Sequence, residues 1–227
     1  MRWLTAFSVF TSVAWFGLLL SGGSLTPPDP ATLPGLFAQA DAGASTHVSP
    51  DLKAKYRRPD SVPAPKNNPL TPEKVELGKH LFFDTRLSST RNISCASCHN
   101  PGFDWSDGRA RGLGVTGVPL PRRTPSVLNA AWLTALMWDG RAQNLEQQAA
   151  LPLTAEHEMG MPLDEAAQRL KTIDGYAPLF EAAYPGKGIS VESMLGALAS
   201  FQRTLVSQKA PFDRWIEGDE TAISEAA

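Results

Sequence analysis

The chain has 227 residues, of which 42% are apolar, and it carries 21 Lys+Arg against 23 Asp+Glu for a formal net charge of −2. This balance gives no basic field that would attract nucleic acid, so we expect no nucleic-acid partner. The composition is that of a globular protein, and the length suits one substantial domain or two small ones.

The N-terminal segment has the features of an export signal. Residues 3–20 read WLTAFSVFTSVAWFGLLL, contain no charged residue and follow Arg2. The length of this apolar run lies between that of a signal-peptide core and that of a membrane-spanning helix. We therefore assign residues 1–24 to a signal peptide or an N-terminal membrane anchor, and both alternatives stay open.

The next segment is rich in proline. Residues 27–72 contain ten of the 19 prolines and few aromatic side chains. Such a composition cannot bury enough apolar surface to fold alone. We expect residues 25–69 to form an extended linker and residues 70–227 to form the compact domain.

Apolar spacing in this domain predicts helices. Thr71 is an expected N-cap and Pro72 the first helical residue of a helix that ends near Asp84. Two later helices are indicated by apolar residues at helical spacing, the second behind the expected N-cap Ser190: Leu163, Ala166, Ala167, Leu170 and Ile173; Val191, Met194, Leu195, Leu198 and Leu205. Glycines between residues 102 and 125 mark a long irregular loop. No strand pattern is convincing, so we predict a mostly α fold, a cytochrome c-like helical haem domain with long loops.

The only two cysteines, Cys95 and Cys98, lie in the segment SCASCHN with His99 directly after them. A structural zinc would need four ligands, which this segment does not supply. A thioredoxin-like redox pair would follow a strand in a βαβ pattern, which is not seen here. C-x-x-C-H is the attachment signature of c-type haem, because two thiols three residues apart share one face of a helical turn. We predict one haem c, bound covalently through Cys95 and Cys98, with His99 as the iron ligand. Export to the periplasm agrees with this prediction, since covalent haem attachment in bacteria is completed outside the cytoplasm.

Five segments carry a wider pattern: LGKHLFFDTRLSSTRNISCASCHNP, RRTPSVLNAAW, MWDGRAQNLEQQA, HEMGMP and FQRTLVSQKAPFDRWIEGD. Together they resemble the N-terminal haem domain of bacterial di-haem cytochrome c peroxidases, over residues 70–227. A methylamine-utilisation di-haem enzyme that oxidises a protein substrate is similar as well. The resemblance implies hydrogen peroxide as substrate and a small cytochrome c or cupredoxin as electron donor, and it is compatible with a homodimer. It also implies a second haem in a C-terminal domain that this sequence lacks.

The resemblance assigns roles to three further residues. Trp138 corresponds to the tryptophan between the two haems, Gln148 to the distal-pocket glutamine and Glu158 to the distal glutamate. A carboxylate above the open iron position can move a proton from the near to the far oxygen of peroxide, and burial should raise its pKa toward neutrality. Gln148, which is neutral with a donor and an acceptor, can orient peroxide.

Two positions depart from the pattern of that family. Val115 stands where the usual enzymes have a loop histidine that ligates the resting iron, so this loop supplies no sixth ligand. Arg123 stands where an asparagine is associated with an inter-domain calcium, which argues against calcium there. The remaining histidines, His47, His80 and His157, are expected in the linker, on the surface of the first helix and in solvent.

Three functions compete. The leading hypothesis is a haem c peroxidase domain that reduces hydrogen peroxide to water. The first alternative is an electron-transfer cytochrome without catalysis, in which Met137, Met159 or Met161 closes the sixth position. The second is di-haem oxidation of a protein substrate, as in methylamine utilisation. Gln148 and Glu158 favour catalysis because neither has a role at a closed haem.

Overall fold

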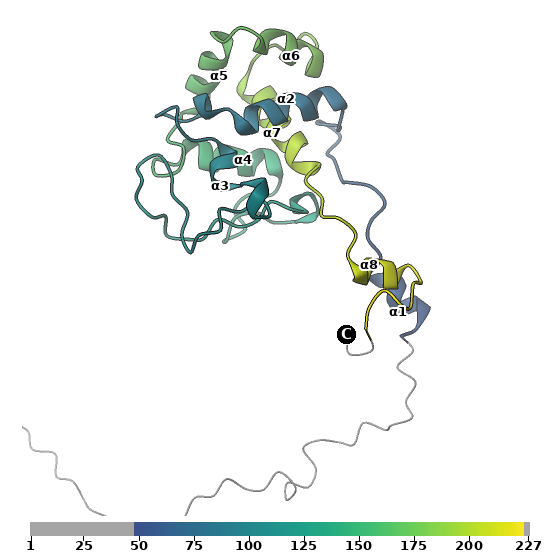
Figure 1. Ribbon diagram of the computed structural model, residues 1–227. Helices are drawn as coiled ribbons and strands as arrows, with labels where there is room; N and C mark the ends of the chain where they lie inside the picture. Colours follow the sequence, from purple (N-terminus) through teal and green to yellow (C-terminus); the bar gives the residue numbers. More distant parts are fainter. Residues whose placement is uncertain (1–47, 225–227) are drawn as a thin grey trace, which may run out of the picture. The chain divides into compact units, whose positions relative to one another are not determined.

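The computed structural model describes residues 48–224, so the predicted export segment, the first part of the predicted linker and His47 lie outside the described residues. The described chain is mostly helical, as predicted, and within it β-type pairing is limited to isolated bridges. The α-helices and 3-10 helices are, in chain order, α1 (Pro50–Lys55), α2 (Pro72–Phe83), η2 (Thr85–Leu87), α3 (Cys95–Cys98), η3 (Pro101–Phe103), η4 (Ala130–Trp132), α4 (Leu145–Thr154), α5 (Leu163–Lys171), α6 (Tyr176–Ala183), α7 (Val191–Arg203) and α8 (Pro211–Ile216) (Figure 1).

Helix α2 begins and ends where the sequence predicts. The Thr71 side chain accepts a hydrogen bond from the Lys74 N–H at 3.4 Å, and Pro72 is the first helical residue. Proline suits this position because its missing N–H would have no helical partner. The helix ends at Phe83, and the Asp84 N–H donates to the carbonyl of Leu81.

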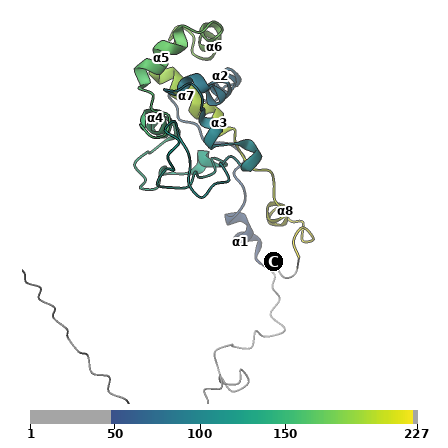
Figure 2. The same ribbon diagram turned by 60° about the vertical axis from the view of Figure 1, so that its left-hand side comes forward.

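The long helices α2 and α7 form the centre of the fold and lie side by side in both views (Figures 1 and 2). Gly78 is the point of closest approach between them. A Cβ atom at this position would lie 2.0 Å from the carbonyl oxygen of Ala197 and 2.8 Å from the Cβ of Phe201. Only glycine allows the two backbones to come this close.

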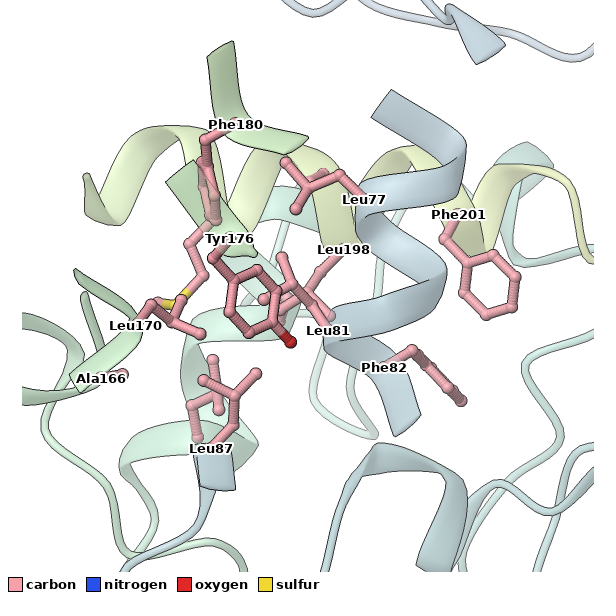
Figure 3. Packing of buried hydrophobic residues seen from close by; sticks show 14 of the residues in the cluster. Leu77, Leu81, Phe82, Leu87, Ala166, Leu170, Tyr176, Phe180, Leu198 and Phe201 are labelled. Atoms are coloured by element: carbon pink, nitrogen blue, oxygen red, sulfur yellow. The ribbon is translucent and has the colours of Figure 1, made fainter. Parts of the chain in front are cut away.

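The hydrophobic core fills the space between α2, α7 and the two helices before α7. Figure 3 shows Leu77 and Leu81 of α2 near Leu198 of α7, with Phe180 and Tyr176 of α6 close to them. The apolar face predicted for α5 is buried through its central residues, as expected from their spacing: Ala166, Ala167 and Leu170. These contacts fix α2 and α7, which in turn carry the aromatic residues behind the turn that contains Cys95 and Cys98.

Helix α4 is followed by a tight turn that folds back on it. The Asn144 side chain caps its start by accepting from the Gln147 N–H at 2.9 Å. After the helix, the Met159 N–H donates to the carbonyl of Pro152 at 3.2 Å and the Met161 N–H to that of Leu153 at 2.7 Å. Residues 155–160 are thereby fixed to the end of α4.

The segment expected as an extended linker contains a helix, α1, in its described part. Ser49 caps this helix and Pro50 is its first residue. One of the prolines that suggested an extended chain therefore occupies the first position of a helix, where proline is favoured. Lys53 is buried: its Nζ donates to the carbonyl of Trp215 at 3.2 Å and lies 4.0 Å from the centre of the Trp215 ring. Helices α1 and α8 are thus held side by side.

The last residues of the predicted linker also belong to the compact structure. Asn68 is buried, and its Nδ2 donates to Glu146 at 2.8 Å and to the carbonyl of Gly196 at 2.9 Å. Lys74 donates to the Asn68 side-chain oxygen at 3.1 Å. The compact structure therefore begins before residue 70. The composition did not indicate this, because the contacts that hold the segment are polar rather than apolar.

Among residues 48–224, no helix combines the length and the apolar character needed to cross a bilayer.

Candidate haem site

The two cysteines lie in one helical turn, α3, as predicted. The Ser94 N–H donates to Ser97 Oγ at 2.9 Å and closes the start of this turn. Both thiols are unpaired in the described structure. Burial raises the pKa of the Cys95 thiol to about 12, and burial also raises the pKa of Cys98. The thiols therefore stay protonated at neutral pH, which lowers their reactivity in disulfide exchange.

His99 follows the turn as its C-cap and is oriented by a backbone carbonyl. Its Nδ1 lies 3.2 Å from the carbonyl oxygen of Trp105. A carbonyl only accepts hydrogen bonds, so Nδ1 carries the proton and the lone pair of Nε2 is available to a metal. Burial lowers the pKa of the imidazole, although the hydrogen bond with the Trp105 carbonyl acts in the opposite direction. The neutral ring is the form that binds iron.

A strained turn aims the Trp105 carbonyl at His99. The Asn100 N–H donates to the carbonyl of Ser106 at 2.8 Å, and the Trp105 N–H donates to the carbonyl of Asn100 at 2.9 Å. Asp104 and Trp105 have φ angles of 53° and 59°, in the left-handed region that non-glycine residues seldom adopt. Backbone strain of this kind persists only where surrounding contacts enforce it.

Aromatic rings pack behind His99. The ring of Phe82 lies 6.4 Å from that of His99, 6.0 Å from Trp105 and 5.2 Å from Phe201, measured between centroids. Phe82 and Phe201 lie beside each other where α2 meets α7 (Figure 3). This cluster gives the His99 side of the candidate site an apolar, packed wall.

Glu158 lies on the turn after α4 and is half-buried. Burial raises the pKa of its carboxyl group, while the charge of Arg141 opposes this effect. The charge of Glu158 also contributes to raising the pKa of Cys98, so this carboxylate lies within electrostatic reach of the attachment turn. A carboxyl whose pKa is raised toward neutrality is suited to accept and return a proton.

The other two predicted site residues have different surroundings. Gln148 of α4 is partly buried, and its Nε2 lies 4.0 Å from the sulfur of Met137. Trp138 is 86% exposed and extends into solvent next to Met137, which adopts a left-handed φ of 69°. Gln148 therefore contacts protein, whereas Trp138 does not belong to the packed part of the site.

The residues present fit a covalently bound haem. They provide two thiols on one turn and an imidazole whose Nδ1 is held by a backbone carbonyl. In addition, the indole Nε1 of Trp132 is buried and has no hydrogen-bond partner within residues 48–224. An unsatisfied buried donor costs about 1–3 kcal/mol, so this N–H would gain from an acceptor that the described residues do not supply.

The structure also shows the surroundings of Val115 and Arg123, the two positions that depart from the family pattern. The Val115 N–H donates to the carbonyl of Glu158 at 2.8 Å, so its loop touches the distal turn through the backbone. Arg123 is exposed. As predicted, His157 is exposed and His80 is a surface residue, which lies 3.2 Å from Glu76.

Sequence reasoning overlooked three residues of the site. Trp105 acts through its carbonyl, which leaves no mark in the sequence. Arg141 lies in the segment that also contains Trp138, and nothing in the motif singles out its charge. Gly114 is one of several glycines in the loop sequence, but only the structure shows that a Cβ there would lie 1.9 Å from the carbonyl oxygen of His157.

A surface cavity of about 450 Å³ lies elsewhere, beside α2, and none of the six predicted site residues lines it. Most of its charged residues are paired: Glu76 lies 3.2 Å from His80, and Asp84 accepts from Arg86 at 2.7 Å and from the Tyr176 hydroxyl at 2.6 Å. These pairs leave little unsatisfied charge for a ligand.

Comparison with known proteins defines the class. A sequence profile described as di-haem cytochrome c peroxidase matches residues 72–221. The chain therefore belongs to the di-haem cytochrome c peroxidase family, an oxidoreductase family, and haem c is its cofactor.

Among its relatives, the methylamine utilization protein MauG of Methylorubrum extorquens is 54% identical over 95% of this chain and 60% of its own length. The cytochrome c551 peroxidase of Pseudomonas aeruginosa is 36% identical over 82% of this chain and 54% of its own. A crystal structure of a MauG-like protein associated with microbial copper homeostasis shares 33% identity and a TM-score of 0.68, covering 74% of this chain and 51% of that one. The chain thus spans 60% or less of the length of each of these relatives.

Covalent attachment through both cysteines can be tested by mass. We expect the holoprotein to keep its porphyrin after acid-acetone extraction, because each thiol at the α3 turn can form a thioether. Replacing both Cys95 and Cys98 by Ala should release the haem, whereas Ser97→Ala, between them, should retain it. Intact-mass measurement decides the matter, and release of haem from the unaltered chain would contradict it.

Proposed function

We propose that residues 70–227 form the peroxide-reacting haem domain of an exported, periplasmic di-haem oxidoreductase. The observation that carries the proposal is the half-buried carboxyl of Glu158, whose pKa is raised by burial. The turn that carries Glu158 contacts residues 113–115 through the Val115 N–H, and Leu113 in the same loop contacts Cys98. Hydrogen peroxide is the substrate, and a small cytochrome c or cupredoxin supplies two electrons, so that peroxide and two protons give two molecules of water.

The chain's own residues have separate tasks in this reaction. A haem bound at Cys95, Cys98 and His99 supplies the electron transfer that breaks the O–O bond. The Trp105 carbonyl keeps the proton on His99 Nδ1 and so holds the ring with Nε2 directed away from that carbonyl.

Glu158 handles the proton. In its ionised form it accepts the proton of the peroxide oxygen that stays behind, and it then returns this proton to the other oxygen, which leaves as water. Gln148 offers one amide donor and one acceptor, which can orient peroxide without a change in charge. Met137, in contact with Gln148 Nε2 at 4.0 Å, restricts the rotation of that side chain.

Oxidation of a protein substrate is a second candidate, supported by two observations. The chain is 54% identical to MauG of Methylorubrum extorquens, against 36% for the cytochrome c551 peroxidase. Trp138 is 86% exposed among the described residues, and the resemblance places its counterpart between the two haems, where an aromatic ring can pass electrons. Under this function Trp138→Phe should slow substrate oxidation while leaving the reaction with peroxide unchanged.

A closed electron-transfer haem is less well supported. Met159 and Met161 are 5% and 0% exposed and are members of the hydrophobic core. A methionine packed in the core would have to leave it to reach an iron atom. The remaining candidate, Met137, is partly buried and contacts Gln148.

The resting ferric holoprotein tests the proposal directly. Val115 has no lone pair on its side chain, so its loop cannot provide a sixth iron ligand through a side chain. We expect a high-spin electron paramagnetic resonance signal and a reaction with one equivalent of peroxide without prior reduction. A dominant low-spin signal that peroxide leaves unchanged would reject a peroxide-reacting site.

A further inference from the structure

Residues 113–115 contact both the turn that carries Cys98 and the turn that carries Glu158. At one end, Cys98 Sγ donates to the carbonyl oxygen of Leu113 at 3.5 Å. At the other end, the Val115 N–H donates to the carbonyl of Glu158 at 2.8 Å. Thioether formation would remove the S–H of Cys98, so at the first end the link is the proximity of Leu113 to Cys98 rather than this hydrogen bond.

Gly114, between these two contacts, lies flush against the turn that carries Glu158. A Cβ at position 114 would lie 1.9 Å from the carbonyl oxygen of His157, 2.6 Å from that of Glu158 and 2.7 Å from the Cα of Glu158. All three are backbone atoms, so no side-chain rotation can relieve the contact. Any side chain at this position must push the loop and the turn apart by about 1 Å or more.

The turn cannot easily yield to such a displacement. The Glu158 and Gly160 N–H groups both donate to the carbonyl of Ala155, at 3.0 and 2.9 Å. On the other side, the Ser89 N–H donates to the carbonyl of Met159 at 2.9 Å. The backbone at Glu158 is therefore held by three parts of the chain: Ala155, Ser89 and residues 113–115. Of these three, only residues 113–115 also contact the turn that carries Cys98.

We propose that Gly114 is a positioning residue: its missing side chain lets residues 113–115 act as a spacer that sets the distance between the haem-attachment turn and the Glu158 carboxylate. This inference rests on the proposed function, in which Glu158 moves the proton. A carboxylate displaced by about 1 Å is poorly placed for proton transfer, and a displacement of this size can cost about a hundredfold in rate.

The test uses the holoprotein with Gly114→Ala, Glu158→Gln and the double variant. Two rates are measured: the reaction with peroxide, and the association of cyanide with the ferric haem. Hydrogen cyanide binds as the anion, so its association reports a proton acceptor without turnover. We expect Gly114→Ala to slow both rates by about ten- to a hundredfold while haem content stays unchanged. In the double variant the two effects should not multiply, because Gly114 acts only through Glu158.

Gly112→Ala is the matched control. It alters the same loop, but its Cβ would meet side-chain atoms, the nearest being Thr124 Oγ1 at 2.7 Å, and not the turn of Glu158. Its rates should equal those of the unaltered protein. If Glu158→Gln alone leaves both rates unchanged, the proposed function fails. If Glu158→Gln slows them but Gly114→Ala has no effect, or an effect that multiplies in the double variant, only the positioning role fails.

A measurement without substitution covers the case in which Gly114→Ala does not fold. Amide hydrogen exchange of the unaltered holoprotein should show slow exchange at Val115, because its N–H is held by the Glu158 carbonyl. Exchange as fast as that of an unprotected loop amide would show that the spacer is not in place, and would overturn the inference.

Discussion

Replacing Glu158 by Gln should slow the reaction of the holoprotein with peroxide by about a hundredfold or more, the usual scale for the loss of a positioned acid-base group. Glutamine preserves the size of the side chain, so haem incorporation should not change. The measurement is stopped-flow absorbance of the ferric haem after mixing with peroxide. Glu156→Gln, an exposed glutamate on the same turn, is the control and should react as the unaltered protein does.

The same experiment has a pH dependence with a defined sign. Burial raises the pKa of Glu158, and only the ionised carboxylate can accept a proton from peroxide. The rate of the unaltered protein should therefore fall as the pH is lowered through a pKa above the ordinary range for glutamate. Glu158→Gln should lack this decline. An identical pH profile in both proteins, with haem present in each, would remove Glu158 from the mechanism.

Substituting Gly78 by Ala should have the largest effect on stability. The added Cβ would lie 2.0 Å from the Ala197 carbonyl oxygen at the crossing of α2 and α7. Overpacking of this kind costs about 3 kcal/mol, which exceeds the roughly 1 kcal/mol that alanine gains over glycine in a helix. The net loss of about 2 kcal/mol should shift the midpoint of thermal unfolding down by roughly 4–8 °C for a domain of this size.

Lys79→Ala is the control for that substitution, because Lys79 is exposed on the same helix. Its free energy of unfolding should stay within about 0.5 kcal/mol of the unaltered value. If Gly78→Ala were as stable as the unaltered protein, the two helices would have to pack less closely than the structure shows.

The sequence predicts the local elements well where the signal is local. Thr71 and Pro72 mark the start of α2, and the spacing of Cys95 and Cys98 before His99 places the attachment motif on one helical turn. These features depend on neighbours within a few residues. The boundary of the compact structure could not be found in this way, because Asn68 is held by Glu146 and Gly196, which are distant in the sequence.

In the candidate site, too, local features could be predicted from the sequence and long-range contacts could not. Its chemistry-bearing side chains could be named from motifs, but the groups that orient them are backbone atoms. The carbonyl of Trp105 beside His99 and the flush contact at Gly114 arise from tertiary approach. A linear pattern contains no information on which carbonyl a loop will meet, so these contacts had to come from the structure.

The exposure of Trp138 has an optical consequence. An indole in water emits at longer wavelengths than the half-buried rings of Trp105 or Trp132, and a porphyrin quenches nearby indole emission by resonance energy transfer. The difference in fluorescence between the unaltered protein and Trp138→Phe therefore isolates one solvent-facing emitter at 86% exposure. A protein that covers this ring would shift its emission to the blue, so Trp138 is a built-in reporter of docking.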